Sequence, residues 1–162
     1  MFELKESNTA DKPAFYQELC SQARGLLSGE KDLIANAANI SSLLFHSLPD
    51  VNWVGFYFLK NGELVVGPFQ GKPACVRIAL GAGVCGKAAQ DRETVRVANV
   101  HEFAEHIPCD ADSNSEIVIP LINRGEVIGV LDVDSPVFDR FDQDDQQGLE
   151  SLVEVFVNNV AD

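Results

Sequence analysis

The strongest constraint on the fold is where two kinds of hydrophobic periodicity fall along the chain. Apolar residues recur at spacings of three and four over about 13–47 and 143–160, which predicts amphipathic helices at both ends. The segment between them, about 51–134, has short β-branched and aromatic runs separated by turn residues, which predicts strands. This order predicts a single α+β domain over residues 1–162, with terminal helices packed on a sheet of antiparallel hairpins.

Two hairpins organise the predicted sheet. The run 51–59 is apolar on both alternations, which is typical of a central strand covered on two faces. An Asn-Gly pair at 61–62 follows it and supplies the positive φ of a tight turn. The second hairpin joins 115–122 to 126–134.

Charge narrows the classes of partner. The 162 residues include 25 acidic and 12 basic side chains, for a formal net charge of −13. Such a surface repels a phosphate backbone, so we expect neither nucleic acid nor an anionic membrane as a partner. The sequence has no long apolar span, and its first residues lack the pattern of a secretion signal, so we expect a cytoplasmic protein.

Three glycines match a cofactor-binding motif by spacing alone. Gly81, Gly83 and Gly86 reproduce the dinucleotide fingerprint between a predicted strand and a short helix over about 84–90. That helix is too short for a parallel crossover, and hairpins replace repeated βαβ units elsewhere. We therefore interpret the glycines as permitting a sharp turn and close packing.

Acidic side chains gather on the second hairpin. Asp132 and Asp134 share one face of their strand because side chains alternate. A three-residue loop at 123–125 would place Glu116 directly opposite Asp132, whereas a two-residue loop would put Glu116 on the other face. If the three acids converge, their repulsion must be offset by a shared proton or by a small cation, such as a metal ion or an ammonium group. The alternative is a solvated strand end.

The four cysteines divide by their local setting. Cys20 lies on the first helical pattern, where packing is its expected role. Cys109 lies in an irregular loop, where reactive groups tend to lie. Cys85 opens a helix, which favours a thiolate, and Cys75 lies at a strand edge. Each could instead be a small buried apolar residue.

A zinc site and the role of the tryptophan are both left open by the sequence. A zinc site could be built from Cys75, Cys85, Cys109 and His106, but their spacing fits no standard zinc motif. Trp53 is the only tryptophan, and a regular strand would turn it toward the same side as a tyrosine four residues on. It could be a core residue, or its ring could hold a methyl group or a cation in a pocket.

Six short segments together resemble a known family. They are Asn-Trp-Val-Gly-Phe-Tyr at 52–57, Gly-Pro-Phe-Gln-Gly-Lys-Pro-Ala-Cys at 67–75, Gly-Val-Cys-Gly at 83–86, His-Ile-Pro-Cys-Asp at 106–110, Ser-Glu-Ile-Val-Ile-Pro at 115–120 and Gly-Val-Leu-Asp-Val-Asp-Ser at 129–135. In these segments the chain resembles the free methionine-(R)-sulfoxide reductases, which are stand-alone GAF domains. The resemblance covers nearly the whole chain and includes three spaced cysteines.

The resemblance implies a fold, an activity and a set of site residues. The fold is a six-stranded antiparallel sheet with helices outside it, commonly in a homodimer. The activity is reduction of free L-methionine (R)-S-oxide to L-methionine, with Cys109 as nucleophile, Cys75 as its disulfide partner and Cys85 as a less essential thiol. The substrate pocket would be lined by Trp53, Glu116, Asp132 and Asp134.

A mechanism follows from this resemblance and from the crowded acids. Cys109 would attack the sulfoxide sulfur while Glu116 protonates the oxygen, leaving a sulfenic acid that condenses with Cys75. Thioredoxin would then reduce the disulfide, so no bound cofactor is expected. Two other functions remain open, a non-catalytic GAF sensor of a small ligand and a structural dimerisation module.

Overall fold

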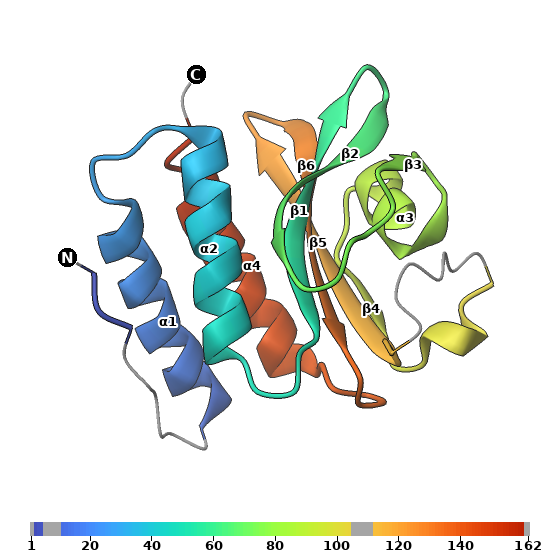
Figure 1. Ribbon diagram of the computed structural model, residues 1–162, viewed down its shortest axis with the longest axis horizontal. Helices are drawn as coiled ribbons and strands as arrows, with labels where there is room; N and C mark the ends of the chain where they lie inside the picture. The colour runs from blue at the N-terminus through green and yellow to red at the C-terminus, as the bar shows by residue number, and fades with distance from the viewer. Residues whose placement is uncertain (1, 5–10, 105–111, 161–162) are drawn as a thin grey trace.

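Six strands form one antiparallel sheet that carries helices on both faces (Figure 1). The computed structural model describes residues 2–4, 11–104 and 112–160. Its elements in chain order are α1 (Lys12–Leu27), α2 (Leu33–Ser47), β1 (Trp53–Lys60), β2 (Glu63–Gln70), β3 (Arg77–Ala79), α3 (Gly83–Asp91), β4 (Val95–Val97), a 3₁₀ turn η1 (Val100–Glu102), β5 (Ser115–Asn123), β6 (Glu126–Ser135) and α4 (Gln143–Val157).

The strand order is β3-β2-β1-β6-β5-β4, so the two long strands β1 and β6 lie at the centre. Residues 53–58 of β1 are buried, which confirms the prediction of a strand covered on both faces. Asn61 and Gly62 have φ values of 53° and 83°, which confirms the tight turn between β1 and β2. The predicted six-stranded α+β fold is confirmed.

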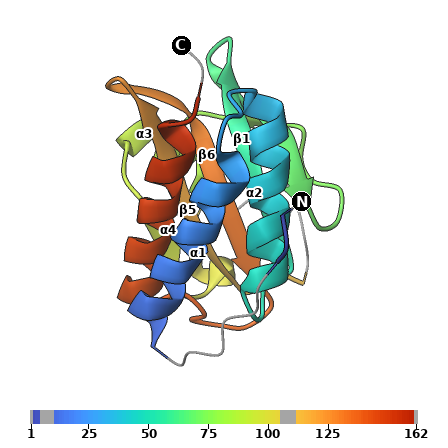
Figure 2. The same ribbon diagram turned by 90° about the vertical axis from the view of Figure 1, so that its left-hand side faces the viewer.

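Three helices lie on one side of the sheet. α2 packs on β1 and β2, and α4 packs on β5. Figure 2 shows α1 in front of these two helices, and α1 packs on both of them rather than on the sheet. Local sequence starts two of these helices, because Asp32 accepts a hydrogen bond from the backbone of Ala35 and Asp142 forms a capping box with Asp145. The larger hydrophobic cluster fills the space between these helices and the sheet.

The other face of the sheet carries α3 and a second, smaller hydrophobic cluster. α3 connects strands at opposite edges of the sheet, β3 and β4, and therefore passes over the central strands. Gly81 and Gly83 adopt positive φ, and a Cβ on Gly86 would lie 2.4 Å from the carbonyl oxygen of Ala79. The three glycines thus permit a sharp turn and close packing, as interpreted from the sequence.

All pairings among the described strands are antiparallel, so the parallel unit that a dinucleotide fingerprint requires is not present there. Within the same described residues, none of the helices combines the length and the apolar character that a bilayer-spanning segment needs.

Candidate functional site

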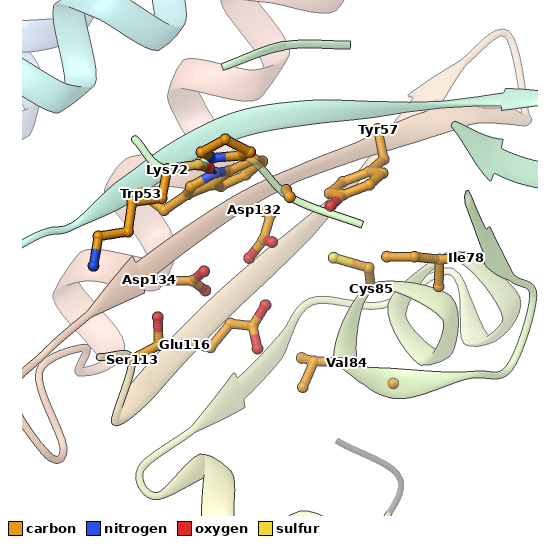
Figure 3. A pocket seen from close by; sticks show the side chains of 13 residues that line it. Trp53, Tyr57, Lys72, Ile78, Val84, Cys85, Ser113, Glu116, Asp132 and Asp134 are labelled. Carbon is orange, nitrogen blue, oxygen red and sulfur yellow. Dashed lines mark hydrogen bonds between the residues drawn. The ribbon is translucent and has the colours of Figure 1, made fainter. Parts of the chain in front are cut away.

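A pocket lies between α3 and the central strands, and its walls combine aromatic, acidic and thiol side chains. Figure 3 shows the carboxyl groups of Glu116, Asp132 and Asp134 pointing toward one another, with the sulfur of Cys85 directed into the same space. The other side chains at this pocket include Trp53, Tyr57, Lys72, Val84, Ile78 and Ser113.

Strand register brings the acids together. Asp132 and Asp134 alternate on β6, and Asp134 pairs with Trp53 of β1 on one side and with Glu116 of β5 on the other. Three adjacent strands therefore present a tryptophan, an aspartate and a glutamate in one row across the sheet. The predicted convergence of the acids is confirmed, but the predicted partner of Glu116 is wrong, because Glu116 lies opposite Asp134 rather than Asp132.

Two features of the β5–β6 hairpin explain this difference. The loop has two residues, Arg124 and Gly125, whose φ values of 54° and 82° belong to a tight primed turn rather than to the predicted three-residue loop. Alone, that loop would place Glu116 on the opposite face. The register then shifts between Leu121 and Ile122, with Ile128 as the extra residue on β6, and this bulge returns Glu116 to the face of the aspartates.

The Trp53 ring is held rigidly at the pocket. It stacks on Phe69 with ring centroids 5.1 Å apart and on Tyr57 at 5.9 Å. Its Nε1 donates a 3.0 Å hydrogen bond to the backbone oxygen of Lys72. Gly55 leaves the space that the ring needs, because a Cβ at that position would lie 2.8 Å from the Trp53 ring. The prediction that Trp53 and Tyr57 point to the same side is confirmed.

Burial and crowding raise the pKa values of two of the acids, Glu116 and Asp132. Burial first, and then the neighbouring Asp132 charge, raises the pKa of Glu116 well above its ordinary value. Burial and the Asp134 charge do the same for the pKa of Asp132. A hydrogen bond between Glu116 and Asp132 adds to the rise in the pKa of the glutamate and opposes the rise in the pKa of the aspartate.

One oxygen of the cluster is left for a ligand. Asp132 is 5% exposed, and its Oδ1 has no hydrogen-bond partner among the described residues. A buried acceptor without a partner costs free energy, about 1–3 kcal/mol for a neutral group and more for a charged one. A cationic or hydrogen-bonding ligand in the pocket would recover that cost.

Cys85 does not have the predicted thiolate character. It lies in the first turn of α3, as expected, but it is buried and surrounded by acids. Burial, followed by the Asp132 and Glu116 charges, raises the pKa of Cys85 well above its ordinary value. The helix N-terminus favours the thiolate by only about 0.3–1 kcal/mol, which desolvation and three nearby acids outweigh.

The remaining cysteines occupy different settings. Cys75 is half-buried just before β3, next to the pocket, and is disulfide-bonded. Cys20 is a buried free thiol in the helix-side cluster, which confirms its predicted packing role. Cys109 and His106 lie outside the described residues.

A metal-ligating group does form, but not the one considered from sequence. One ligand atom each from Cys85, Glu116 and Asp132 lies within 4.8 Å of the other two. In the zinc set considered from the sequence, Cys75 is committed to a disulfide, so it offers no thiolate to share with Cys85.

Sequence reasoning missed two polar contributors to the pocket. Tyr57 donates a 3.1 Å hydrogen bond to the backbone oxygen of Cys75 and so ties β1 to the segment before β3. Lys72 lines the pocket and pairs with Asp112 at 2.7 Å. The position of Tyr57 four residues after Trp53 was the available signal, whereas nothing in the local sequence placed Lys72 beside the acids.

The comparisons with known proteins agree with this geometry. The GAF domain family matches residues 32–161. The free methionine-R-sulfoxide reductase of Escherichia coli (strain K12) is 52% identical over 143 residues, which cover 88% of this chain and 87% of the relative.

Solved structures of high similarity share the whole fold. A crystal structure of a GAF protein from Burkholderia vietnamiensis is 60% identical, with a TM-score of 0.90 over 93% of this chain and 96% of that one. The free methionine-R-sulfoxide reductase of Neisseria meningitidis, solved with its substrate, is 40% identical, with a TM-score of 0.93 over 98% of this chain and 95% of that one.

Proposed function

Because the chain belongs to the free methionine-R-sulfoxide reductases of the GAF domain family, we propose that it reduces free L-methionine (R)-S-oxide to L-methionine. The observation that carries this proposal is the group of three acids beneath Trp53, built by β1, β5 and β6 in a largely buried pocket.

The acids give the pocket a reason to select a free amino acid. The α-ammonium of methionine sulfoxide would bind to Asp132 and Asp134 and supply a partner for Asp132 Oδ1. A residue inside a peptide has no such ammonium, so its binding would leave buried carboxyl groups without compensation. Recognition of the ammonium therefore explains a preference for the free substrate.

The aromatic wall would orient the sulfoxide. Trp53 is fixed by stacking and by the bond to the Lys72 backbone, so its face offers a rigid apolar surface to the S-methyl group. With the ammonium and the methyl group both held, one sulfoxide configuration directs its sulfur toward the nucleophile and the other does not. We assign the preference for the R epimer to this pair of contacts.

We assign the nucleophile to Cys109, from the sequence resemblance. Its thiolate attacks the sulfoxide sulfur, the S–O bond breaks, and the oxygen stays on Cys109 as a sulfenic acid while methionine leaves as a thioether. Glu116 supplies the proton that the oxygen needs, since burial and the neighbouring Asp132 charge raise the pKa of Glu116 well above its ordinary value.

The sulfenic acid is then removed by a second thiol. Attack by Cys75 forms a disulfide and releases water. The disulfide-bonded state of Cys75, together with the free thiols of Cys20 and Cys85, supports this assignment. Cys85 is proposed as an additional, less essential thiol, because its raised pKa makes it a poor nucleophile near neutral pH.

External partners complete the cycle. We propose that thioredoxin reduces the disulfide, that no bound cofactor is required because thiols supply both electrons, and that the protein works in the cytoplasm as a homodimer. The net charge of −13 supports a small cationic group rather than a polyanion as the ligand.

The test is a count of methionine formed by the reduced protein without added reductant, using the R and S epimers separately. We expect about one methionine per subunit from the R epimer, with thiols lost in parallel, because one turnover consumes two cysteines. No methionine from either epimer, with thiols intact, would contradict the proposal and leave the ligand-sensor function.

A second assay separates the two cysteine roles. Cys109→Ser should abolish the first turnover, whereas Cys75→Ser should still release methionine once and fail to recycle. Equal loss of the first turnover in both variants would contradict the assignment of the nucleophile.

A further inference from the structure

The three groups from separate elements that meet in the pocket form a chemically mixed set. Cys85 comes from α3, Glu116 from β5 and Asp132 from β6, and one ligand atom from each lies within 4.8 Å of the other two. All three side chains are buried, with exposures of 4%, 7% and 5%. A thiol among carboxyl groups differs from an ordinary acidic cluster, because it adds a soft ligand to two hard ones.

A second observation, a buried oxygen without a hydrogen-bond partner, indicates that this set is suited to a ligand. Asp132 Oδ1 is buried without a hydrogen-bond partner among the described residues, and Figure 3 shows the Asp132 carboxyl group directed into the space between Glu116 and Cys85. The described cationic side chain at this pocket, Lys72, is largely exposed and pairs with Asp112.

We infer that the pocket binds one zinc ion through Cys85 Sγ and one carboxylate oxygen each from Glu116 and Asp132. Zinc accepts sulfur and oxygen ligands together in a tetrahedral arrangement, at about 2.3 Å for sulfur and 2.0–2.2 Å for oxygen. These bond lengths place ligand atoms roughly 3.4–3.6 Å apart, so ligand atoms that lie within 4.8 Å of one another would have to approach by about 1.4 Å at most. Binding releases the protons of the Cys85 thiol and the Glu116 carboxyl group.

The ligand set distinguishes zinc from harder cations. Magnesium and calcium favour sites made only of oxygen, and a thiolate contributes little to binding them. Three protein ligands leave a fourth position open, which water can occupy. The site is therefore suited to reversible binding rather than to a closed structural role.

Zinc binding has a consequence for activity, and this part rests on the proposed function. A zinc ion on Glu116 and Asp132 occupies Asp132, one of the two acids that would bind the substrate ammonium, and it removes the proton that Glu116 would donate. Zinc and free methionine (R)-S-oxide should therefore exclude each other. The site would make the enzyme sensitive to free zinc as well as to its own redox state.

The first experiment measures metal binding directly, with a readout that does not depend on enzyme activity. The full chain carrying Cys75→Ser and Cys109→Ser keeps only Cys20 and Cys85 as thiols. Titration with cadmium, a zinc substitute, should produce thiolate-to-metal charge-transfer absorption that saturates at one ion per chain, and zinc should displace it.

Matched variants locate the thiol. Adding Cys85→Ala or the nearly isosteric Cys85→Ser should remove the absorption, whereas Cys20→Ala should leave it unchanged, because Cys20 lies in the helix-side cluster. Glu116→Gln should weaken cadmium binding by at least 10-fold, as expected for loss of a ligand. Absorption that survives both Cys85 substitutions, or that is absent while Cys85 is present in folded protein, would overturn the inference.

The second experiment tests exclusion of the substrate. In single turnovers without reductant, zinc should inhibit the wild-type chain competitively with the R epimer. The zinc inhibition constant of Cys85→Ser should be at least 10-fold higher than that of the wild-type chain, with each rate expressed relative to the same protein without zinc. An active enzyme whose single-turnover rate does not change at saturating zinc would overturn the inference that zinc and substrate share one site. Absence of activity without zinc, with the Cys85-dependent cadmium signal intact, would instead contradict only the proposed function.

Discussion

Asp145 and Asp132 are both buried aspartates, but they lie on opposite sides of the sheet and differ in the partners of their carboxyl groups. Asp145, 1% exposed at the start of α4, accepts a 2.6 Å hydrogen bond from the Tyr16 hydroxyl and a 2.7 Å one from Lys12. Arg140 adds a 3.3 Å ion pair. Asp132, 5% exposed, faces another aspartate, a glutamate and a thiol, and its Oδ1 has no partner among the described residues.

The difference separates an acid used for structure from one available for function. The partners of Asp145 come from α1 and from the segment before α4. The carboxylate therefore links the first and last helices, and these partners offset the cost of burying its charge. Asp132 adds repulsion and an unsatisfied acceptor to the folded protein. A fold keeps such a group when a ligand supplies what is missing.

The largest expected effect lies on the pocket side. Glu116→Gln should lower kcat/KM for free methionine (R)-S-oxide about 10²- to 10⁴-fold, because it removes the proposed proton donor while keeping the side-chain volume. Steady-state kinetics with a dithiol reductant measures it. Glu154→Gln, on the exposed surface of α4, is the matched control and should leave the rate unchanged. A Glu116→Gln enzyme with full activity would contradict the role of Glu116.

On the helix side, Asp145→Ala should lower the free energy of unfolding by about 3–5 kcal/mol, because it leaves the Arg140 and Tyr16 groups buried without their acceptor. Chemical denaturation measures this change. Asp144→Ala, one residue earlier and exposed, should cost no more than about 0.5 kcal/mol. At temperatures below its melting transition, the folded Asp145→Ala variant should keep its activity. A folded variant that has lost its activity would contradict the contrast between a structural Asp145 and a functional Asp132.

A smaller effect of opposite sign is expected for Asp132→Asn. Removing one acid from the cluster relieves repulsion, so the free energy of unfolding near neutral pH should rise by about 1 kcal/mol, while substrate binding is lost. Thermal and chemical denaturation report the first change, and substrate-induced changes in Trp53 fluorescence report the second. Destabilisation by more than 1 kcal/mol would mean that Asp132 has a structural role like that of Asp145.

The smallest expected effect is on the pH dependence of stability, which should differ between the pocket side and the helix side of the sheet. The pKa values of Glu116 and Asp132 are raised by burial and by neighbouring acids, so the folded state holds protons that the unfolded chain releases above about pH 4. Stability from these groups is complete below their unfolded pKa values and is lost as pH rises through the folded ones.

The helix side should respond in the opposite direction. The Lys12 hydrogen bond lowers the pKa of Asp142 to about 2, so its contribution is present above pH 3.8, the ordinary value, and is lost as pH falls toward about 2. Denaturation across the pH range should show a flatter neutral limb for Glu116→Gln and a flatter acid limb for Asp142→Asn. Identical slopes in wild type and both variants would contradict these directions.

Local patterns were sufficient for the elements but not for their alignment. Helical spacing, the Asn61-Gly62 turn and the alternation of Asp132 with Asp134 each depend on neighbours in sequence, and each is confirmed. The register of Glu116 depended on a loop length and a bulge, and two departures from the predicted hairpin cancelled. A bulge is stabilised by packing on both faces of the sheet, which a local pattern does not report.

The chemistry of Cys85 shows the same limit from another direction. The sequence correctly placed this residue at a helix start, where the local field favours a thiolate. The connection from β3 to β4 carries α3 over β5 and β6, and this brings the thiol against acids that are about 30 and 50 residues away in the chain.

The sequence by itself determined the set of elements, the aspartates that share a face, and the family to which the motifs belong. Only the tertiary structure decided which strand positions face each other, which carboxyl groups have raised pKa values, and that a buried thiol lies within reach of two of them. The physical reason is range. Periodicity and turn chemistry act over a few residues, whereas pKa values and ligand geometry depend on burial and on charges that only the folded sheet and α3 bring together.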